Sequence, residues 1–382
     1  MKNSVKRNGK NCLLLFDNGN YTLGKGAGLF GNYIGEICFN TSITGYQEIL
    51  TDPSYYNQII NFTFPHVGIV GTNFEDYESD KIYASGCIIN NDLSEASNYR
   101  SKINLNSWLK SKKIGCITGL DTRVLTKQIR RSGVSKALIH YPKKGVFDSL
   151  KKLKLLLNSF PEMNGTDLAS KVTTQNVYVW KKKQKHDFKG KGQKRKFIAV
   201  IDFGIKNNIL NILSSFKYDV IVFPISYPIK EILSMKPEGI FLSNGPGDPK
   251  ATFRKYQKNF NLIKTFSKPV FGICLGHQIL SLIFNAQTEK MHHGHRGANH
   301  PIKNEKTKKV EITVQNHGFV VSKKKFPKTL KVTHSSLFDK TIAGIEVRNK
   351  PFFSVQYHPE SSPGPQDSRY LFDQFFNLMN NA

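Results

Sequence analysis

Cysteine is scarce in this chain of 382 residues, and its five thiols stand far apart in the sequence. No two of them form a C-x-x-C pair; they are Cys12, Cys38, Cys87, Cys116 and Cys274. Disulfide frameworks and structural zinc sites are typically built from even numbers of closely spaced cysteines. The sequence therefore argues against both and indicates a reducing compartment.

Long apolar runs are also missing. The run Cys12–Phe16 near the N-terminus is too short for the core of a secretory signal, and no small-residue cleavage site follows it. No segment approaches the length that a membrane-spanning helix needs. We therefore expect a cytoplasmic protein without a membrane partner.

Acidic residues are few: 28 Asp and Glu stand against 56 Lys and Arg, for a formal charge of +28. Such a charge raises nucleic-acid binding as a rival function. The lysines, however, are spread over most polar segments rather than gathered around aromatic residues, and we find no nucleic-acid-binding motif. We expect weak, non-specific attraction to polyanions and no specific nucleic-acid partner.

Nucleotide-binding motifs are absent or incomplete. There is no G-x-x-x-x-G-K-[ST] segment, and the single G-x-G-x-x-G match at residues 26–31 is not followed by a helical pattern. We interpret that match as a loop and expect neither an ATP site nor another cofactor on this chain.

The length suffices for two domains. Nine of the sixteen residues from 181 to 196 are basic, and only Phe188 among them could join a core. We interpret this stretch as a solvated linker, because like charges repel and extend a chain. The predicted domains are residues 1–192 and 193–382.

Apolar runs that alternate with helical patterns predict an α/β fold for the second domain. The expected strands are 197–201, 219–223, 239–242, 269–271, 310–314, 330–333, 342–347 and 352–356. The expected helices are 205–216, 228–235, 254–266 and 371–378. This order predicts a mostly parallel sheet flanked by helices, with ligands bound at the carboxyl ends of its strands.

The first domain is predicted to be a smaller mixed α/β domain. Its clearest elements are strands at 37–39 and 87–89 and helices at 105–109 and 121–129. Asp121 is the expected N-cap of the second helix.

One cysteine lies where a strand is expected to turn sharply into a helix. Gly272–Gln278 reads GICLGHQ, between an apolar run and a helical pattern. It is the thiol counterpart of the nucleophile elbow, and a helix N-terminus there favours the thiolate. A buried structural cysteine is the alternative. The flanking glycines and the downstream histidine favour a nucleophile.

His358 and Glu360 supply the other half of a catalytic set. A histidine could deprotonate the thiol of Cys274, and a carboxylate could hold the imidazole in the required tautomer. We expect the two residues on one face of a strand, because side chains at i and i+2 share a face. The three residues together predict acyl transfer through a thioester.

A rigid loop is expected to complete the site. Residues 243–249 read SNGPGDP and follow a predicted strand. Their backbone N–H groups could donate to an oxyanion together with the N–H of Leu275. An ordinary turn would use the same residues.

These segments together resemble the class I, triad-type, glutamine amidotransferases. Further segments resemble the small subunit of carbamoyl-phosphate synthase; they are residues 40–55, 65–68, 294–301, 315–319 and 362–365. The likeness covers nearly the whole chain except the Lys-rich stretch. It implies a C-terminal amidotransferase domain that hydrolyses L-glutamine. It also implies a large-subunit partner, in a heterodimer or a higher oligomer, that uses ATP, Mg²⁺ and bicarbonate for arginine or pyrimidine biosynthesis or both.

The resemblance also assigns residues. Cys274 is implied as nucleophile, His358 as base and Glu360 as its orienting carboxylate. The implied glutamine contacts are Ser42, Gly245, Gly247, Leu275, Gln278, Asn316, Gly318 and Phe319. Since Ser42 precedes the Lys-rich stretch, the first domain is expected to reach the glutaminase site.

Four histidines invite a metal interpretation; they are His292, His293, His295 and His300. No carboxylate stands among them and the glycines suggest a turn, so we expect no metal site. Three other functions remain open at this point: an amidotransferase with another acceptor, a peptidase-like hydrolase, and a binding protein that uses the basic surface.

Overall fold

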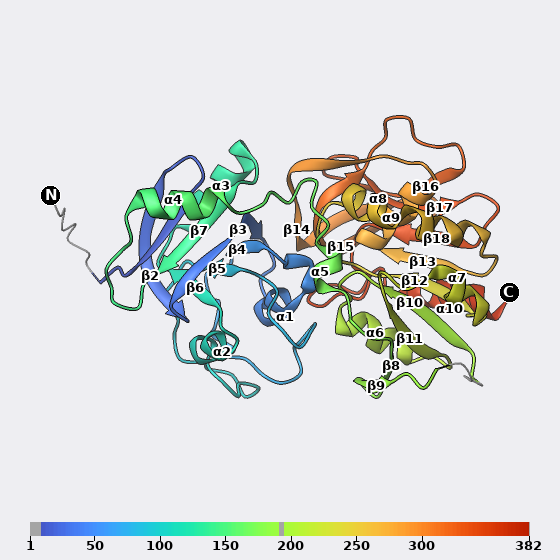
Figure 1. Ribbon diagram of the computed structural model, residues 1–382, viewed down its shortest axis with the longest axis horizontal. Coiled ribbons are helices and arrows are strands. Elements are labelled where there is room, and N and C mark those ends of the chain that lie inside the picture. The colour runs from blue at the N-terminus through green and yellow to red at the C-terminus, as the bar shows by residue number, and fades with distance from the viewer. Residues whose placement is uncertain (1–8, 191–194, 382) are drawn as a thin grey trace. The chain divides into compact units, whose positions relative to one another are not determined.

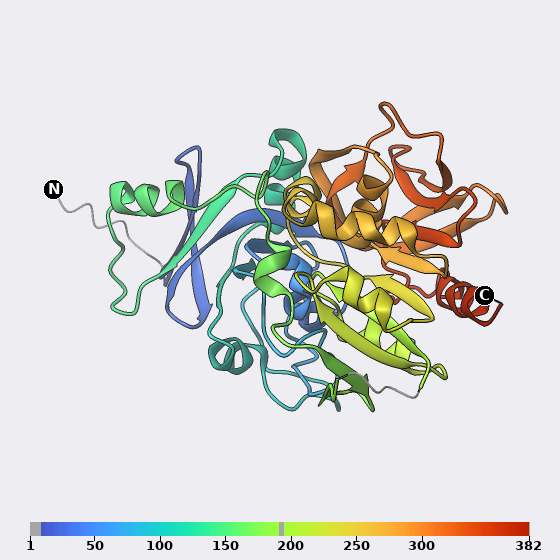
Figure 2. The same cartoon turned by 45° about the vertical axis from the view of Figure 1, so that its right-hand side comes forward.

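The chain forms two compact units, residues 1–163 and 164–382. The computed structural model describes residues 9–190 and 195–381 (Figures 1 and 2). This division differs from the boundary expected near residue 192. Residues 164–190 lie in the second unit, because strand β8 (Tyr178–Lys181) pairs with a strand of the second unit's sheet.

The first unit is built on a closed barrel of seven strands. Their order around the barrel is β1, β2, β6, β5, β4, β3 and β7, with β7 pairing back to β1. The strands are β1 (Cys12–Phe16), β2 (Tyr21–Gly28), β3 (Gly31–Asn40), β4 (Gln58–Phe62), β5 (Gly86–Ile88), β6 (Gly115–Thr118) and β7 (Lys136–Tyr141). Strands β3 to β6 run parallel, and the remaining pairs are antiparallel.

Apolar side chains alternate along the strands, so that one set fills the barrel and the other packs on its outside. On β1, Leu14 joins a cluster with residues from β3 to β7, while its neighbours Leu13 and Leu15 pack against a helix. The helices of this unit are α1 (Tyr46–Thr51), η1 (Pro53–Tyr55), α2 (Leu105–Ser111), α3 (Thr122–Ser132) and α4 (Leu150–Asn158). Helix α4 covers the Leu13 side, and α1 and α2 cover a second outer cluster.

The expected elements of this unit are confirmed. The helices predicted at 105–109 and 121–129 are α2 and α3, and the Asp121 side chain accepts a hydrogen bond from the Val124 N–H at 2.9 Å as an N-cap. Residues 26–31 form the end of β2, a short connection and the start of β3, with no helix after them.

The second unit contains one sheet of eleven strands among the described residues. Their order is β15, β14, β16, β17, β18, β13, β12, β10, β11, β8 and β9. Besides β8, they are β9 (Gln184–Asp187), β10 (Phe197–Asp202), β11 (Asp219–Pro224), β12 (Gly239–Leu242), β13 (Val270–Ile273), β14 (Thr288–Asn304), β15 (Val310–Val321), β16 (Leu330–Ser336), β17 (Ile342–Val347) and β18 (Phe352–Val355). The five strands from β18 to β11 are parallel, and antiparallel pairs extend the sheet at both ends.

Helices cover both faces of the parallel centre (Figure 1). They are α5 (Ala169–Val172), α6 (Asn207–Ser214), α7 (Ile229–Ser234), α8 (Pro249–Phe260), η2 (Asn261–Thr265), α9 (Leu275–Ile283) and α10 (Tyr370–Asn380). Along β10, Ala199 packs with residues of α7, α8 and α9, and Val200 packs with residues of α6 and α10. The α/β layering predicted from the sequence is confirmed.

Helix α8 and the Lys-rich stretch differ from the prediction. The helix expected from residue 254 begins at Pro249, because Asp248 caps it by accepting from the Lys250 N–H at 2.8 Å. The Lys-rich stretch, expected as a solvated linker, instead contains a hairpin of β8 and β9. Strand β8 contributes the buried Tyr178 and Trp180 to the core, whereas β9 is held by backbone pairing alone, since its side chains are all exposed. Residues 191–194 of the stretch lie outside the described residues.

No helix among the described residues has the length and apolar character needed to cross a bilayer.

Candidate active site

Cys274 lies at the turn between β13 and α9, as predicted. Its backbone adopts φ 53° and ψ −104°, a strained conformation for a residue with a side chain. The glycines on either side permit the turn. A Cβ on Gly276 would stand 2.1 Å from the Leu242 carbonyl oxygen, and one on Gly272 would stand 2.8 Å from the Gly276 backbone. The elbow therefore depends on glycine at both positions.

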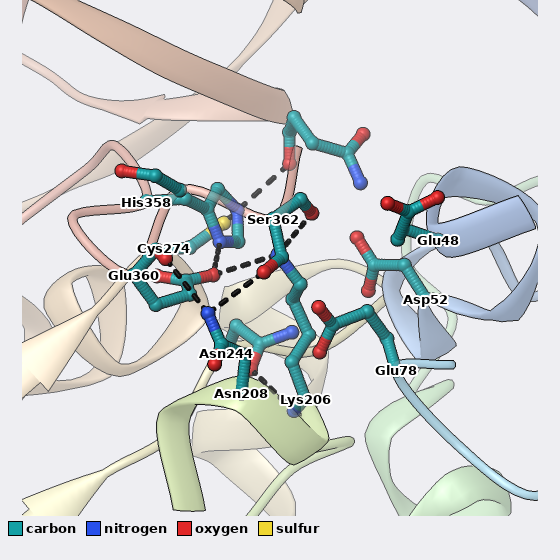
Figure 3. Close-up of polar contacts among 12 residues, drawn as sticks. Glu48, Asp52, Glu78, Lys206, Asn208, Asn244, Cys274, His358, Glu360 and Ser362 are labelled. Carbon is teal, nitrogen blue, oxygen red and sulfur yellow. Dashed lines mark hydrogen bonds and ion pairs between the residues drawn. The ribbon is translucent and has the colours of Figure 1, made fainter. Parts of the chain in front are cut away.

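Three groups surround the buried Cys274 sulfur. The thiol donates to the Asn316 carbonyl oxygen at 3.5 Å, and Gln356 Nε2 donates to the sulfur at 3.7 Å. The third group is His358 (Figure 3), whose pKa is raised in part by its electrostatic interaction with Cys274. The site therefore brings together the predicted nucleophile and the predicted base.

His358 and Glu360 form a buried pair. Glu360 Oε1 lies 2.7 Å from His358 Nδ1, which directs Nε2 away from the carboxylate. The prediction that both residues share a strand is wrong, because β18 ends at Val355 and they lie in the loop after it. This loop is anchored by the His358 N–H, which donates to the Val314 carbonyl at 2.9 Å.

Electrostatics fix the charge states of this pair. Burial raises the pKa of Glu360, but the positive charges of Lys206 and His358 lower it by more. The net result is a pKa below its ordinary value. Burial lowers the pKa of His358, but the Glu360 charge and the Cys274 contact outweigh burial, so the pKa lies above its ordinary value. The site therefore favours the ionised form of Glu360 and the protonated form of His358, which is the form that His358 takes when it accepts the thiol proton.

Lys206 and Asn208 hold Glu360 in place, and sequence reasoning missed both (Figure 3). Lys206 Nζ donates to Glu360 Oε1 and to the Ser362 carbonyl, each at 2.9 Å. Asn208 Nδ2 donates to the Glu360 carbonyl at 2.9 Å and to Ser362 Oγ at 2.7 Å. One signal was available: Lys206 follows the carboxyl end of β10, where parallel sheets bind ligands.

Four of the predicted glutamine contacts form a connected group with the nucleophile. Asn316, Gly318 and Phe319 lie on β15, and Gln278 lies on α9. Gln278 Nε2 donates to the Phe319 carbonyl at 2.7 Å and to Gln356 Oε1 at 3.0 Å. Gln356 was not predicted from the sequence.

The loop after β12 places two more predicted residues, Gly245 and Gly247, beside the elbow. The Gly276 N–H donates to the Ser243 carbonyl at 2.9 Å, which joins loop and elbow. A Cβ on Gly245 would lie 2.1 Å from the Phe203 carbonyl oxygen, and Gly247 has φ +99°. Within the described part of the chain, the N–H groups of Gly245 and Leu275 have no acceptor and remain available to a ligand.

Ser42 lies in the first unit, after β3. Its N–H donates to Asn40 Oδ1 at 2.7 Å, and its side chain is buried. Its contact with glutamine stays a prediction.

The four-histidine segment belongs to strand β14, so the turn expected there is wrong. Two register shifts interrupt its pairing with β15, which explains why the sequence shows no strand alternation. His295 Nε2 lies 2.9 Å from Asp339 Oδ2, a carboxylate distant in sequence. In residues 9–190 and 195–381, no group of three or more His, Cys, Asp or Glu side chains is arranged to hold a metal ion.

Two family models match the chain. Residues 199–378 match glutamine amidotransferase class-I, and residues 14–139 match the carbamoyl-phosphate synthase small chain, CPSase domain. The two matched segments correspond to the second and the first unit.

Relatives match almost the full length. The carbamoyl phosphate synthase small chain of Bradyrhizobium diazoefficiens is 48% identical over 375 residues, covering 96% of this chain and 94% of that protein. The small chains of Bartonella henselae and Rhizobium meliloti are 47% and 46% identical, each covering 96% of this chain and 94% of the relative.

Proposed function

This chain belongs to the carbamoyl phosphate synthase small chain family, and we propose that it hydrolyses L-glutamine through a Cys274–His358–Glu360 triad. The ammonia passes to a large subunit that makes carbamoyl phosphate from bicarbonate and ATP. ATP and Mg²⁺ are bound by that partner, and this chain uses no cofactor. The product serves arginine biosynthesis, pyrimidine biosynthesis or both.

The observation that carries this proposal is the buried site itself. A strained elbow presents Cys274, and a His358–Glu360 pair held by a 2.7 Å contact adjoins the thiol. The three groups come from loops at the carboxyl ends of neighbouring parallel strands, β13 and β18. A nucleophile, a base and an orienting carboxylate in this relation support acyl transfer.

In the first step the Cys274 sulfur attacks the side-chain amide carbon of glutamine. His358 takes the thiol proton and returns it to the leaving nitrogen, so that ammonia departs and a glutamyl thioester remains. The negative oxygen of the tetrahedral intermediate accepts hydrogen bonds from the N–H groups of Gly245 and Leu275, which have no other acceptor within the described chain.

In the second step water attacks the thioester carbonyl carbon. His358 accepts a proton from that water and delivers it to the Cys274 sulfur as the carbon–sulfur bond breaks, so that glutamate leaves and the thiol is restored. Glu360 stays ionised throughout and holds His358 Nδ1. The remaining proposed contacts hold glutamine in place; they are Ser42, Gly247, Gln278, Asn316, Gly318 and Phe319.

The matched N-terminal segment favours this function over the alternatives. An amidotransferase for another acceptor, or a peptidase-like hydrolase, would need the elbow and triad alone. Residues 14–139 match the domain of the carbamoyl-phosphate synthase small chain specifically. The ammonia acceptor is therefore proposed to lie on that enzyme's large subunit, in a heterodimer or a higher oligomer.

The proposal is tested with Cys274→Ser in the complex of both subunits. Glutamine-dependent carbamoyl phosphate synthesis is expected to vanish, because a hydroxyl lacks thiolate character. Ammonia-dependent synthesis is expected to persist, since the ATP chemistry lies on the other chain. Normal turnover with glutamine in this variant would refute the assignment of Cys274.

A further inference from the structure

We propose that Gln356 is a catalytic residue of this site, whose side-chain N–H stabilises the Cys274 thiolate. The proposal rests on the proposed glutaminase function. Gln356 would be a third functional group of the site, beside the nucleophile Cys274 and the base His358.

Gln356 is held at the sulfur by its backbone and by burial. It directly follows β18, is 1% exposed, and its backbone N–H donates to the Ala343 carbonyl at 2.9 Å. Its side chain contacts two groups: Nε2 lies 3.7 Å from Cys274 Sγ, and Oε1 accepts from Gln278 Nε2 at 3.0 Å.

A chain of hydrogen bonds that starts at a backbone carbonyl determines which end of the amide faces the sulfur. The Phe319 carbonyl can only accept, so the Gln278 atom 2.7 Å from it must be the NH₂ group. That NH₂ group can only donate, so it faces the oxygen of Gln356. The nitrogen of Gln356 is thereby directed at Cys274.

The two polar neighbours of the sulfur have opposite preferences. The Asn316 carbonyl oxygen, 3.5 Å away, accepts from the thiol and repels a thiolate. The Gln356 N–H, 3.7 Å away, can only donate, and a donor binds a charged acceptor more strongly than a neutral one. When Cys274 loses its proton, the Asn316 contact becomes unfavourable and the Gln356 contact becomes stronger. Gln356 therefore favours the nucleophilic form.

The test uses two substitutions that remove the donor. Gln356→Glu keeps the size and the acceptor for Gln278 but turns a second oxygen toward the sulfur. Gln356→Met keeps the length of the side chain without any donor. The rate of Cys274 alkylation by iodoacetamide is measured across pH, by mass spectrometry of the peptide that contains Cys274, beside kcat and KM for glutamine.

A hydrogen bond to a charged group contributes enough for about a tenfold change in the thiolate fraction. Gln356→Met is therefore expected to slow alkylation about tenfold on the acid side of the profile and to move its midpoint to higher pH. Gln356→Glu should shift it at least as far, because its carboxylate repels the thiolate. In both variants kcat should fall more than KM rises.

A matched control is Gln374→Glu, the same chemical change at an exposed position of α10, which should leave both profiles unchanged. Gln278→Leu removes the donor that orients Gln356 and should shift the alkylation profile in the same direction. Circular dichroism and thermal unfolding establish that each variant is folded.

Unchanged alkylation profiles in folded Gln356→Met and Gln356→Glu would overturn the proposal, even if glutamine hydrolysis fell. If the Gln356 variants do not fold, an unchanged profile in Gln278→Leu overturns it. Failure of the glutaminase function itself would appear elsewhere, as hydrolysis that survives Cys274→Ser.

Discussion

Two cations share one oxygen of Glu360. His358 Nδ1 and Lys206 Nζ both contact Oε1, at 2.7 and 2.9 Å, while buried Oε2 has no partner within the described residues. A buried carboxylate without such partners would take up a proton rather than stay charged. Lys206 therefore keeps Glu360 ionised, and Glu360 in turn keeps His358 oriented toward the nucleophile.

Removing the base should cost far more than removing its orienting carboxylate. His358→Ala is expected to lower kcat for glutamine hydrolysis by about 10²–10⁴-fold, the range of a positioned general base. Glu360→Gln should lower it less, because the amide oxygen still accepts from Nδ1. Steady-state glutaminase assays measure both, with ammonia-dependent synthesis as the control. Rates near wild type for both variants would exclude the triad.

The same pair should make stability depend on pH. The lowered pKa of Glu360 contributes stability above its ordinary value of 4.5, which is lost as pH falls toward about 2. The raised pKa of His358 contributes stability below its ordinary value of 6.5, which is lost as pH rises toward about 10. Both contributions are present between pH 4.5 and 6.5.

The difference in urea midpoint between wild type and Glu360→Gln should therefore be largest in that window and smaller on either side. Urea unfolding at about pH 3, 5.5 and 9 measures it. A difference that does not change with pH would mean that the pair carries no linked charge.

At the scale of elements, the elbow depends on how closely α9 approaches the end of β12. An added methyl at residue 276 would stand 2.1 Å from the Leu242 carbonyl oxygen, so Gly276→Ala must push the two elements apart. Displacements of about 1 Å at an active site can lower rates roughly 10²-fold, and overpacking destabilises by about 1–3 kcal/mol. We expect both losses, in kcat and in thermal midpoint. Wild-type values for both would show that the elbow can relax.

The sequence predicted elements with clear periodicity and missed those without it. The buried strands β10 to β13 and the cap Asp121 follow rules of local sequence. Strand β14 escaped prediction because its register shifts break alternation. Strand β9 escaped because it lies in the lysine-rich stretch and pairs with β8 through its backbone, with all its side chains exposed.

The residues of the candidate site also differ in whether a local sequence pattern marks them. Cys274, His358 and Glu360 carry motifs that can be recognised along the chain. Lys206 contacts Glu360 across 154 positions of sequence. No local pattern marks a contact between residues so distant, so only the fold reveals it.

At the scale of the whole molecule, the charge of +28 calls for a test separate from catalysis. In the β8–β9 hairpin, Lys182 and Lys183 have positive φ, a conformation that asparagine tolerates. The triple variant Lys182→Asn, Lys183→Asn and Lys189→Gln should hydrolyse glutamine at the wild-type rate. Any nucleic-acid binding should weaken. The slope of log K against log[salt] should become shallower by at most about 0.9 per lysine removed.

Binding titrations across a salt series check this prediction beside the glutaminase assay. Tight, sequence-selective binding at physiological salt that is lost in the triple variant would instead support a nucleic-acid function.

A covalent intermediate on Cys274 would be direct evidence for the proposed mechanism. The complex of both subunits is mixed with isotope-labelled glutamine, quenched in acid during turnover, and digested for peptide mass spectrometry. A labelled glutamyl thioester is expected on Cys274, and it should be absent from Cys274→Ser and from the other four cysteines. Glutamine hydrolysis without any adduct during turnover, or with an adduct on another cysteine, would contradict the proposed mechanism.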